Sequence, residues 1–431
     1  MIAWREDEVV ESKRTRLVIW GGSAVGTPSF IHVLRTRLLP EERLDVVLVG
    51  RTPSKLATVG ELCRKLAEAS EGDIHVSCTT DMEEALVGAD YILNQIRVGG
   101  LEGRAFDETF PHGLGLPGEE TVGPGGFSSA LRSIPAVLEY CRQAEKVAPA
   151  ALILNLANPS SYVQYAIRRY TSMSVLGVCD MPARLTHRLA DLLGFPHDQL
   201  EFDYVGMHHA GWVTGVRHQG RDVMPQVLDR AEDAEPYVDP LLIRAIGAIP
   251  SRYFRYHFHP DRMWASQLHN TCRAEQLMEI QAELLTDYAR PDAHERPDIG
   301  VQRGAVWYEL IVAPVLLSLM RDSHQCFILN VDNRSTIPWL PAEAIIEVPC
   351  VVGAHGACPL DVGPVPLDVK AWLQCNCAYE MLAVQGIVER SYALALRALL
   401  LNPMIYSLDV ARAVLDKVWS LDSSATPTGA V

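Results

Sequence analysis

Short segments that are apolar throughout alternate with segments of helical pattern along the first 180 residues. The apolar segments lie at 16–20, 44–50, 75–79, 89–96, 151–158 and 175–180, and the helical ones lie at 29–39, 54–69, 81–89 and 128–147. Strands without a polar face belong in a parallel sheet that helices cover on both sides. The alternation therefore predicts an α/β fold with a Rossmann-like, doubly wound parallel sheet.

The pattern changes after residue 212. Helices are expected at 240–249, 272–285 and 304–321, strands at 326–333 and 344–352, and closing helices at 370–401 and 411–418. A chain of 431 residues is too long for one ordinary hydrophobic core. We expect a Rossmann-like domain at 16–200 and a mixed α+β domain at 201–420 that binds substrate, completes the site and supports oligomerisation. Disordered tails are expected at 1–15 and 421–431.

Chemically distinctive residues stand where the expected strands of the first domain end. They are Gly21, Arg97, Asn158, Cys179 and Asp180. In a parallel sheet, ligands collect at the carboxyl ends of the strands. These residues therefore predict a single pocket at that edge of the sheet.

Composition and charge narrow the class of protein. The net charge of −15 argues against a nucleic acid or an anionic membrane as partner, since either would need a basic face. The ten cysteines show no disulfide-like spacing, which indicates a reducing compartment. The N-terminal segment is polar and the longest apolar run is too short to cross a bilayer. We expect a cytoplasmic enzyme that acts on a small molecule.

The stretch from 175 to 212 offers ligands for a metal ion. One apolar run ends on Cys179 and Asp180, and a second, FDYVGM, ends on His208 and His209. A thiol and an imidazole suit a borderline-soft divalent metal. Taken alone, the stretch is explained more simply by a buried free cysteine and a surface histidine pair.

The loop after the first strand is a weakened dinucleotide fingerprint. It reads GGSAVG and places Gly21, Gly22, Ser23 and Gly26 before a helix, where backbone N–H groups and the helix dipole can hold a pyrophosphate. The second strand ends on Arg51, where NAD sites usually carry an acidic residue. An arginine there would favour the 2′-phosphate of NADP or would stack on the adenine.

A second loop, at 96–132, is dense in glycine and charge. Its charged residues are Arg97, Glu102, Arg104, Asp107, Glu108, Glu119, Glu120 and Arg132. A connector that only joined a strand to a helix would not need so many charges, so we interpret this loop as functional.

These motifs together resemble glycoside hydrolase family 4, the NAD- and metal-dependent glycosidases and phosphoglycosidases. The matching segments, in order, are IRVGG, DETFP, GEETVGPGG, ALRSIP, ANP, CDMP, GMHHAGW, PSRYFRYH, TCRAEQ and IEVPCVVG. The resemblance covers nearly the whole chain, and no single segment carries it.

The resemblance implies hydrolysis through a redox-assisted elimination, an exception to the usual two-carboxylate mechanism. Hydride passes from C3 of the sugar to NAD⁺, and a divalent metal, usually Mn²⁺, polarises the resulting carbonyl. The C2 proton is removed, the aglycone leaves, water adds, and the hydride returns. The first domain would then bind NAD, with NADP as the alternative, and the cofactor would not be consumed.

The resemblance also assigns roles to individual residues. Cys179 and His209 would bind the metal, Asp180 would be the general acid, and Tyr253 would be the C2 base, with Tyr256 as the alternative. The sugar or its phosphate would contact Arg97, Asn158 and Arg273, and the cofactor would contact Gly21, Gly22, Ser23, Gly26 and Arg51.

Four departures from the family pattern touch the cofactor or the pocket. Glu119 stands where the family has glutamine, and His208 stands where it has asparagine. The loop GGSAVGTP lacks one glycine and the usual Ser-Thr, and the pair at 50–51 replaces an acidic strand end. The role of His208 is left unassigned.

The expected substrate is a 6-phosphoglycoside. An aspartate after the cysteine is typical of family members that act on 6-phospho-α-glucosides, so we expect an α linkage. The alternatives are a 6-phospho-β-glucoside, an unphosphorylated α-glycoside, an NAD(P)-dependent dehydrogenase of sugars or hydroxy acids, and a catalytically inactive NAD-binding sensor. We expect a homodimer or homotetramer.

Overall fold

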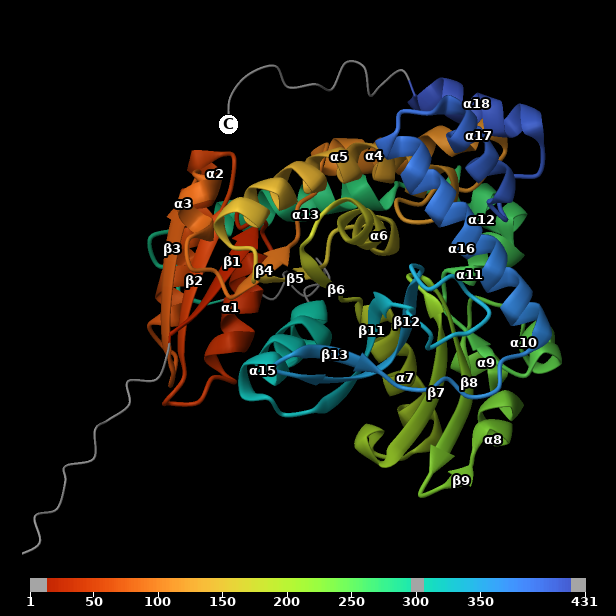
Figure 1. Cartoon of the computed structure of the whole chain (residues 1–431), viewed down its shortest axis with the longest axis horizontal. Coiled ribbons are helices and arrows are strands. Elements are labelled where there is room, and N and C mark those ends of the chain that lie inside the picture. Colours follow the sequence, from red (N-terminus) through yellow and green to blue (C-terminus); the bar gives the residue numbers. More distant parts are fainter. Residues whose placement is uncertain (1–13, 296–305, 420–431) are drawn as a thin grey trace, which may run out of the picture.

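The computed structural model describes residues 14–295 and 306–419, and its first half is built on a parallel sheet (Figure 1). The parallel strands are β1 (Thr15–Trp20), β2 (Arg43–Val49), β3 (Asp73–Thr79), β4 (Tyr91–Asn94), β5 (Leu152–Asn155) and β6 (Ser174–Gly177). They lie side by side in the order β3-β2-β1-β4-β5-β6. This is the strand order of dinucleotide-binding folds, so the predicted fold class is confirmed.

The apolar runs are explained by burial on both faces of the sheet. In β1, Leu17 and Ile19 belong to one hydrophobic cluster, whereas Val18 and Trp20 belong to another. The first cluster contains residues of α1 (Thr27–Arg35), α2 (Pro53–Ala67), α7 (Asp180–Leu193) and α15 (Ala313–Arg321). The second contains residues of α3 (Met82–Leu86), α5 (Gly123–Val147) and α6 (Ser160–Tyr170). Since alternate residues face opposite sides, a strand covered on both sides must be apolar at every position.

The second half extends the same sheet with antiparallel strands. Among the described residues these are β7 (Leu200–Met207), β8 (Ala210–His218), β9 (Arg221–Asp222), β10 (Ile249–Pro250), β11 (Gln325–Asp332), β12 (Ile345–Gly353) and β13 (Gly356–Pro359). β11 pairs with β6, β12 with β11, and β7 with β12. One sheet therefore crosses the predicted boundary at residue 200, and the division into two domains stays a prediction.

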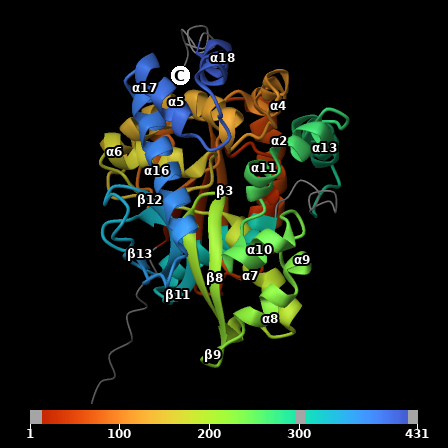
Figure 2. The ribbon, with the colours of Figure 1, turned by 90° about the vertical axis from the view of Figure 1, so that its right-hand side faces the viewer.

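The remaining helices lie around both halves of the sheet (Figure 2). They are α4 (Gly100–Thr109), α8 (Met224–Asp229), α9 (Ala231–Ala234), α10 (Pro240–Ile246), α11 (Phe254–Phe258), α12 (Pro260–Gln267), α13 (Arg273–Tyr288), α16 (Leu367–Val388), α17 (Tyr392–Leu401) and α18 (Leu408–Val418). Short 3₁₀ turns lie at Phe110–Leu114 and His197–Gln199, and a π turn at Tyr308–Val312 precedes α15. α16 to α18 share a hydrophobic cluster with α5 and α6, so the C-terminal helices close over the parallel half.

Several element boundaries differ from those expected from the sequence. α5 begins at Gly123, five residues earlier than predicted, because its glycine-rich first turn is buried against backbone of the preceding loop. The predicted helix at 370–401 is two helices, since the hydroxyl of Ser391 caps the start of α17. The loop at 97–122 contains α4, which was not predicted, and Thr15 lies in β1 rather than in a tail. Arg14, also predicted as part of a tail, pairs with Asp45 and Asp73, and residues 1–13 and 421–431 lie outside the described residues.

Candidate active site

The ends of the parallel strands bring the predicted site residues to one edge of the sheet. Gly21 follows β1, Arg97 follows β4, Asn158 follows β5, and Cys179 follows β6. β1, β4, β5 and β6 are consecutive neighbours in the sheet, so this edge is continuous from the glycine loop to Cys179. The topology therefore places a nucleotide loop and a possible metal ligand on the same rim.

The nucleotide loop, residues 21–27, is shaped by its glycines. Gly21 has a φ of +81°, and a Cβ there would lie 3.0 Å from the carbonyl oxygen of Gln95. The N–H of Gly22 donates to the carbonyl of Val49 (2.7 Å), and a Cβ on Gly22 would lie 2.7 Å from the Cα of Leu48. Larger residues at these positions would displace the loop from the sheet.

The loop leads directly into the N-terminus of α1. α1 begins at Thr27 with no side-chain cap, which leaves its positive end available to an anion. The side-chain amide of Gln95 donates to the carbonyl of Gly21 (3.2 Å) and to the hydroxyl of Thr27 (3.0 Å), and so ties both ends of the loop to β4. Ser23 lies against Gly50, and Arg51 is exposed at the end of β2. The loop therefore fits a dinucleotide pyrophosphate.

Three buried side chains, Cys179, His208 and His209, form what we term the metal cluster. One ligand atom from each lies within 4.8 Å of the others, and all three are at most 7% exposed. Cys179 precedes α7, and the histidines are the two residues of the turn between β7 and β8. The predicted ligands Cys179 and His209 are thus brought together, and His208 joins them. One sulfur and two imidazoles are a donor set suited to a divalent transition metal.

Hydrogen bonds orient His209 for metal binding. Its Nδ1 lies 2.8 Å from the hydroxyl of Thr121. Glu119 accepts from that hydroxyl and from the backbone N–H groups of Thr121 (2.6 Å) and Val122 (3.1 Å). Because the hydroxyl donates to the Glu119 carboxylate, it accepts from Nδ1–H of His209, which leaves Nε2 with a free lone pair. Such a second hydrogen bond is what fixes the tautomer of a metal-binding histidine.

The environment of the metal cluster favours neutral imidazoles. Burial lowers the pKa of His208 to about 3, and burial followed by the adjacent His208 holds the pKa of His209 well below its ordinary value. Burial, Glu347 and Asp180 raise the pKa of the Cys179 thiol, whereas the N–H of Met181 opposes that rise. A bound metal cation would lower the pKa of the Cys179 thiol and favour its thiolate, whose negative charge would offset part of the charge of the ion.

Tyr253 lies directly against the metal cluster. Its ring stacks on that of His209, with centroids 3.7 Å apart and planes at 13°. Tyr256 is farther away, with its ring centroid 6.3 Å from that of Tyr253, and its hydroxyl accepts from Arg255 (3.1 Å). Tyr253 is therefore the nearer of the two tyrosines to the metal cluster.

Asp180 is the first residue of α7, next to the cluster in sequence. Its carboxylate accepts from the guanidinium of Arg184, one helical turn later. Asp180 is half-buried, so its carboxylate is partly accessible from solvent.

Of the two predicted substrate arginines, Arg97 lies in a network of ion pairs, whereas Arg273 donates to the side chain of Gln276 (3.1 Å). Arg97 pairs with Glu120, and Arg104 pairs with both Glu108 (2.6 Å) and Glu120 (2.8 Å). Arg273 begins α13 and is exposed, and its pKa is lowered by desolvation and by the nearby Arg104. An anion beside these two guanidinium groups would relieve their repulsion. Asn158 precedes a cis proline, at the turn between β5 and α6.

Comparisons with known proteins agree with this geometry. Residues 17–195 match the family model described as family 4 glycosyl hydrolase, and residues 204–405 match that of its C-terminal domain. A probable 6-phospho-beta-glucosidase of Bacillus subtilis (strain 168) is 30% identical over 96% of this chain and 98% of its own. The chain belongs to glycoside hydrolase family 4.

Solved structures of family members superpose on almost the whole chain. The 6-phospho-beta glucosidase from Thermotoga maritima, with NAD and glucose-6-phosphate, gives a TM-score of 0.86 at 27% identity, over 95% of this chain and 99% of that one. A 6-phospho-alpha-glucosidase from gut microorganisms, in complex with NAD and Mn²⁺, gives a TM-score of 0.85 at 26% identity, over 95% of this chain and 98% of that one. The resemblance inferred from the motifs is therefore confirmed at the level of family and fold.

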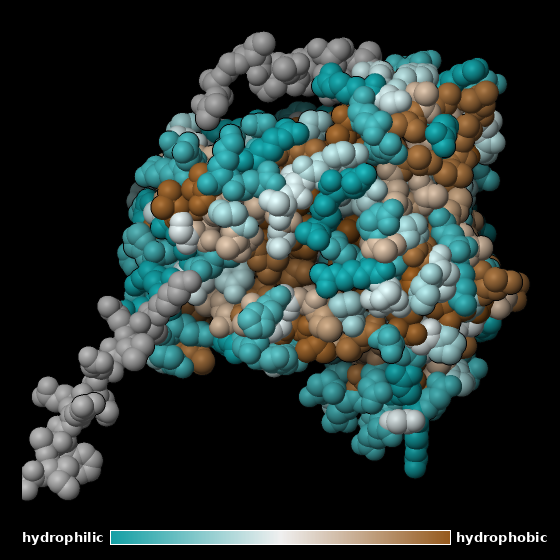
Figure 3. Space-filling view, viewed as in Figure 1, coloured by the Kyte–Doolittle hydropathy of each residue, from teal (hydrophilic) through white to brown (hydrophobic). Residues whose placement is uncertain are grey.

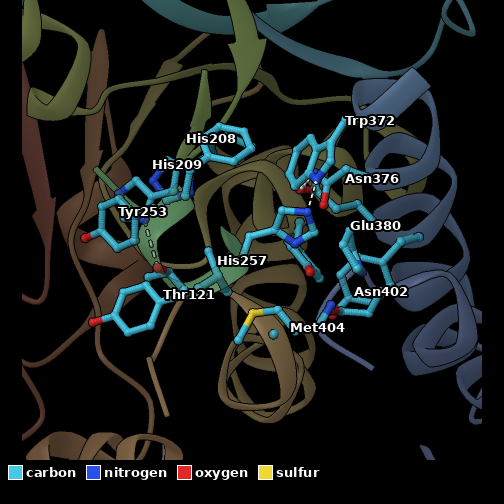
Figure 4. A pocket seen from close by; sticks show the side chains of 18 residues that line it. Thr121, His208, His209, Tyr253, His257, Trp372, Asn376, Glu380, Asn402 and Met404 are labelled. Atoms are coloured by element: carbon cyan, nitrogen blue, oxygen red, sulfur yellow. Dashed lines mark hydrogen bonds between the residues drawn. The ribbon is translucent and has the colours of Figure 1, made fainter. Parts of the chain in front are cut away.

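A pocket beside the metal cluster has a wall that the sequence did not indicate (Figure 4). It holds about 470 Å³ of empty space, its open mouth included. One wall carries Thr121, His208, His209 and Tyr253, and the opposite wall carries Trp372, Asn376, Glu380, Asn402 and Met404. α16 was predicted only as a closing helix. The signal that could have indicated this wall is a pair of polar residues one turn apart, Asn376 and Glu380, which are buried and hydrogen-bonded to each other.

Proposed function

We propose that this family 4 glycosidase cleaves 6-phosphoglycosides, with α-linked substrates preferred, and uses NAD⁺ and a divalent metal ion. The observation that carries the proposal is the buried Cys179–His209 pair with Tyr253 stacked against it, on the rim that also holds the nucleotide loop. The relatives named as 6-phosphoglucosidases support the choice of a phosphorylated substrate.

The nucleotide loop would hold the dinucleotide, and Cys179 and His209 would hold the metal ion. When bound, the nicotinamide supplies a reversible hydride acceptor for C3, and the ion supplies a Lewis acid for the sugar oxygens. Tyr253 removes the C2 proton of the substrate. Burial raises the pKa of the Tyr253 phenol, and a cation held beside His209, on which the ring stacks, would oppose that rise.

Asp180 protonates the oxygen of the leaving group, and the guanidinium of Arg184 fixes the position of its carboxyl group. Arg97, Arg273 and Asn158 bind the sugar and its 6-phosphate. The two arginines suit a phosphate because each can donate two parallel hydrogen bonds. The preference for an α linkage rests on Asp180, which follows the metal-binding cysteine.

A panel of 4-nitrophenyl glycosides tests this proposal. Both anomers are assayed with and without a 6-phosphate, in the presence of NAD⁺, Mn²⁺ and a reductant. We expect the 6-phospho-α-glucoside to be cleaved fastest, and we expect EDTA to stop the reaction until Mn²⁺ is restored. Cleavage that ignores chelation would remove the metal from the mechanism, and faster cleavage of a β or unphosphorylated substrate would correct the substrate class.

Cofactor stoichiometry separates hydrolysis from the second class of function, an NAD(P)-dependent dehydrogenase. A hydrolase returns the hydride and needs NAD⁺ only in catalytic amount, whereas a dehydrogenase forms one NADH for each substrate. Measuring NADH alongside product distinguishes them. The same titration with NADP⁺ tests whether exposed Arg51 favours a 2′-phosphate.

We further propose a cytoplasmic homodimer or homotetramer. No helix within residues 14–295 and 306–419 is long and apolar enough to cross a membrane. All ten cysteines are free, as in a reducing compartment. Apolar side chains gather along the right-hand edge in Figure 3, near α16 to α18, where Leu367 is 83% and Tyr406 73% exposed. An apolar surface of this kind is typical of subunit contacts.

A further inference from the structure

His208 has a position that the chemistry assigned so far does not use. It shares a two-residue turn with His209, which has a φ of +62°, an uncommon value for a residue with a side chain. The turn stacks the two imidazole rings, with centroids 3.8 Å apart and planes at 21°. Both rings therefore leave the turn toward the same space, beside Cys179.

No hydrogen bond accounts for the burial of His208. Only 5% of the residue is exposed, and within the described part of the chain neither ring nitrogen has a hydrogen-bond partner. His209, by contrast, is held by Thr121 through Nδ1. Burying an imidazole without a partner is unfavourable unless the site supplies one. The nitrogen of His208 faces Cys179 and His209 at a distance of at most 4.8 Å.

We propose that His208 is a third protein ligand of the metal ion, and that it shifts the ion preference of this chain from Mn²⁺ toward Zn²⁺ or Co²⁺. The inference rests on the proposed function, which places a divalent ion between Cys179 and His209. Ligand atoms that share one tetrahedral ion lie about 3.5 Å apart, so the three groups need to approach by roughly 1 Å. The two stacked rings also tilt apart on binding, so that the lone pair of each points at the ion.

The kinds of ligand atom decide which metal ion the site prefers. Mn²⁺ is best served by carboxylate, carbonyl and water oxygens, whereas imidazole and thiolate suit Zn²⁺ and other late divalent metals. With His208 included, the donor set is one sulfur and two imidazole nitrogens. Three protein ligands leave at least one coordination position for a substrate oxygen, as catalytic zinc sites do.

The test compares the wild-type chain with His208→Asn after chelator treatment. Co²⁺ is titrated in while the visible d–d bands and the sulfur-to-metal charge-transfer band are recorded. Affinities for Zn²⁺ and Mn²⁺ are measured by competition with a chelating dye. We expect intense d–d bands of four- or five-coordinate Co²⁺ in the wild type and weaker bands in His208→Asn. Zn²⁺ affinity should fall at least roughly tenfold in His208→Asn, because loss of a residue that only hydrogen-bonds a metal ligand already costs about that much. Mn²⁺ affinity should change less.

One further variant serves as a control, and another replaces His208→Asn if that variant does not fold. His257→Asn changes a histidine that lines the same pocket but lies outside the metal cluster, so its Co²⁺ spectrum should match the wild type. His208→Gln replaces His208→Asn if the latter does not fold, and the same losses are expected.

Unchanged Co²⁺ spectra and an unchanged Zn²⁺-to-Mn²⁺ ratio in the His208 variants would overturn the proposal. If Cys179→Ser still abolished metal binding in that case, the proposed function would stand without a third ligand. If Cys179→Ser bound metal as the wild type does, both the third ligand and the metal site of the proposed function would be wrong.

Discussion

The nucleotide loop and the metal cluster stand on the same rim of the sheet but are built in opposite ways. The loop is made by the backbone of a few consecutive residues, Gly21 to Thr27, and is held by contacts with β2 and β4. The cluster is made by side chains from segments far apart in the chain, Cys179 and the turn at 208–209, supported by Thr121. The loop depends on the absence of side chains, and the cluster depends on particular ones.

The difference implies that each half of the site can be disabled without the other. A change in the cluster should remove metal binding and leave the dinucleotide bound. A change in the loop should weaken the dinucleotide and leave the metal spectrum unaltered. The variants below test this independence, beginning with the largest expected effect.

Replacement of Cys179 by serine should have the largest effect. Loss of the sulfur ligand removes the Lewis acid, which supplies several kcal/mol of transition-state stabilisation, so hydrolysis should fall about a thousandfold or more. Activity and NAD binding are measured on the same preparation, and NAD binding should be retained. Cys141→Ser, at another buried thiol in α5, serves as the control and should keep its activity. Full activity in Cys179→Ser would end its assignment as a ligand.

Gly22→Ala should give the reciprocal result. Its new Cβ would lie 2.7 Å from the Cα of Leu48, so the loop must move, and NAD affinity should fall about 10- to 100-fold. The Co²⁺ spectrum should be unchanged. In Gly113→Ala, the added Cβ would meet no atom within 4 Å, so NAD affinity should equal that of the wild type. A Gly22→Ala enzyme with normal NAD affinity would show that the dinucleotide does not use this loop.

Thr121→Val should weaken the metal site by a smaller factor. Valine preserves the shape but removes the hydroxyl between Glu119 and Nδ1 of His209, so metal affinity should fall roughly tenfold. A matched control exists, because Thr186 makes the same kind of bond to His197 (2.9 Å) away from the site. Thr186→Val should leave metal affinity unchanged. Equal metal affinities in both variants would mean that Thr121 does not orient His209.

Glu380→Gln should have a small effect on the pH dependence of stability. Burial raises the pKa of Glu380 to about 8 in the folded chain, whereas the unfolded chain ionises near pH 4.5. Between these values the folded state holds the extra proton, so this group makes stability fall as pH rises, by up to about 1.4 kcal/mol per pH unit. Removing the group should flatten that fall, which is measured as Tm between about pH 5 and 8.

The control for this variant is Glu389→Gln on the same segment of chain. Glu389 also accepts a hydrogen bond from an amide four residues earlier, Gln385 (2.8 Å), as Glu380 does from Asn376 (2.9 Å), but it is exposed. Its pH profile of Tm should follow the wild type. Identical profiles for all three proteins would mean that Glu380 is already ionised in the folded state.

The same contrast explains what could be predicted from the sequence. The parallel strands and the nucleotide loop were predictable because burial on both faces and a glycine turn leave local patterns, as in β1 and Gly21. The start of α5 at Gly123 was not, because packing against backbone overrides the low helix propensity of glycine.

The metal cluster could not be predicted from a local sequence pattern alone. Cys179 and His209 were identified through the family motifs. Their closeness depends on the strand order of the sheet, in which β11 and β12 lie between β6 and β7. Neither the bond from Thr121 nor the wall formed by α16 follows from spacing along the chain, because both depend on contacts between distant segments.

The most direct test of the whole account is the exchange of the substrate's C2 hydrogen with solvent. The wild-type enzyme hydrolyses a 6-phospho-α-glucoside in D₂O with catalytic NAD⁺, and the sugar product is analysed by NMR and mass spectrometry. If Tyr253 removes the C2 proton, the product should carry deuterium at C2 and no NADH should accumulate. A hydrolysed product without deuterium at C2 would contradict the elimination mechanism.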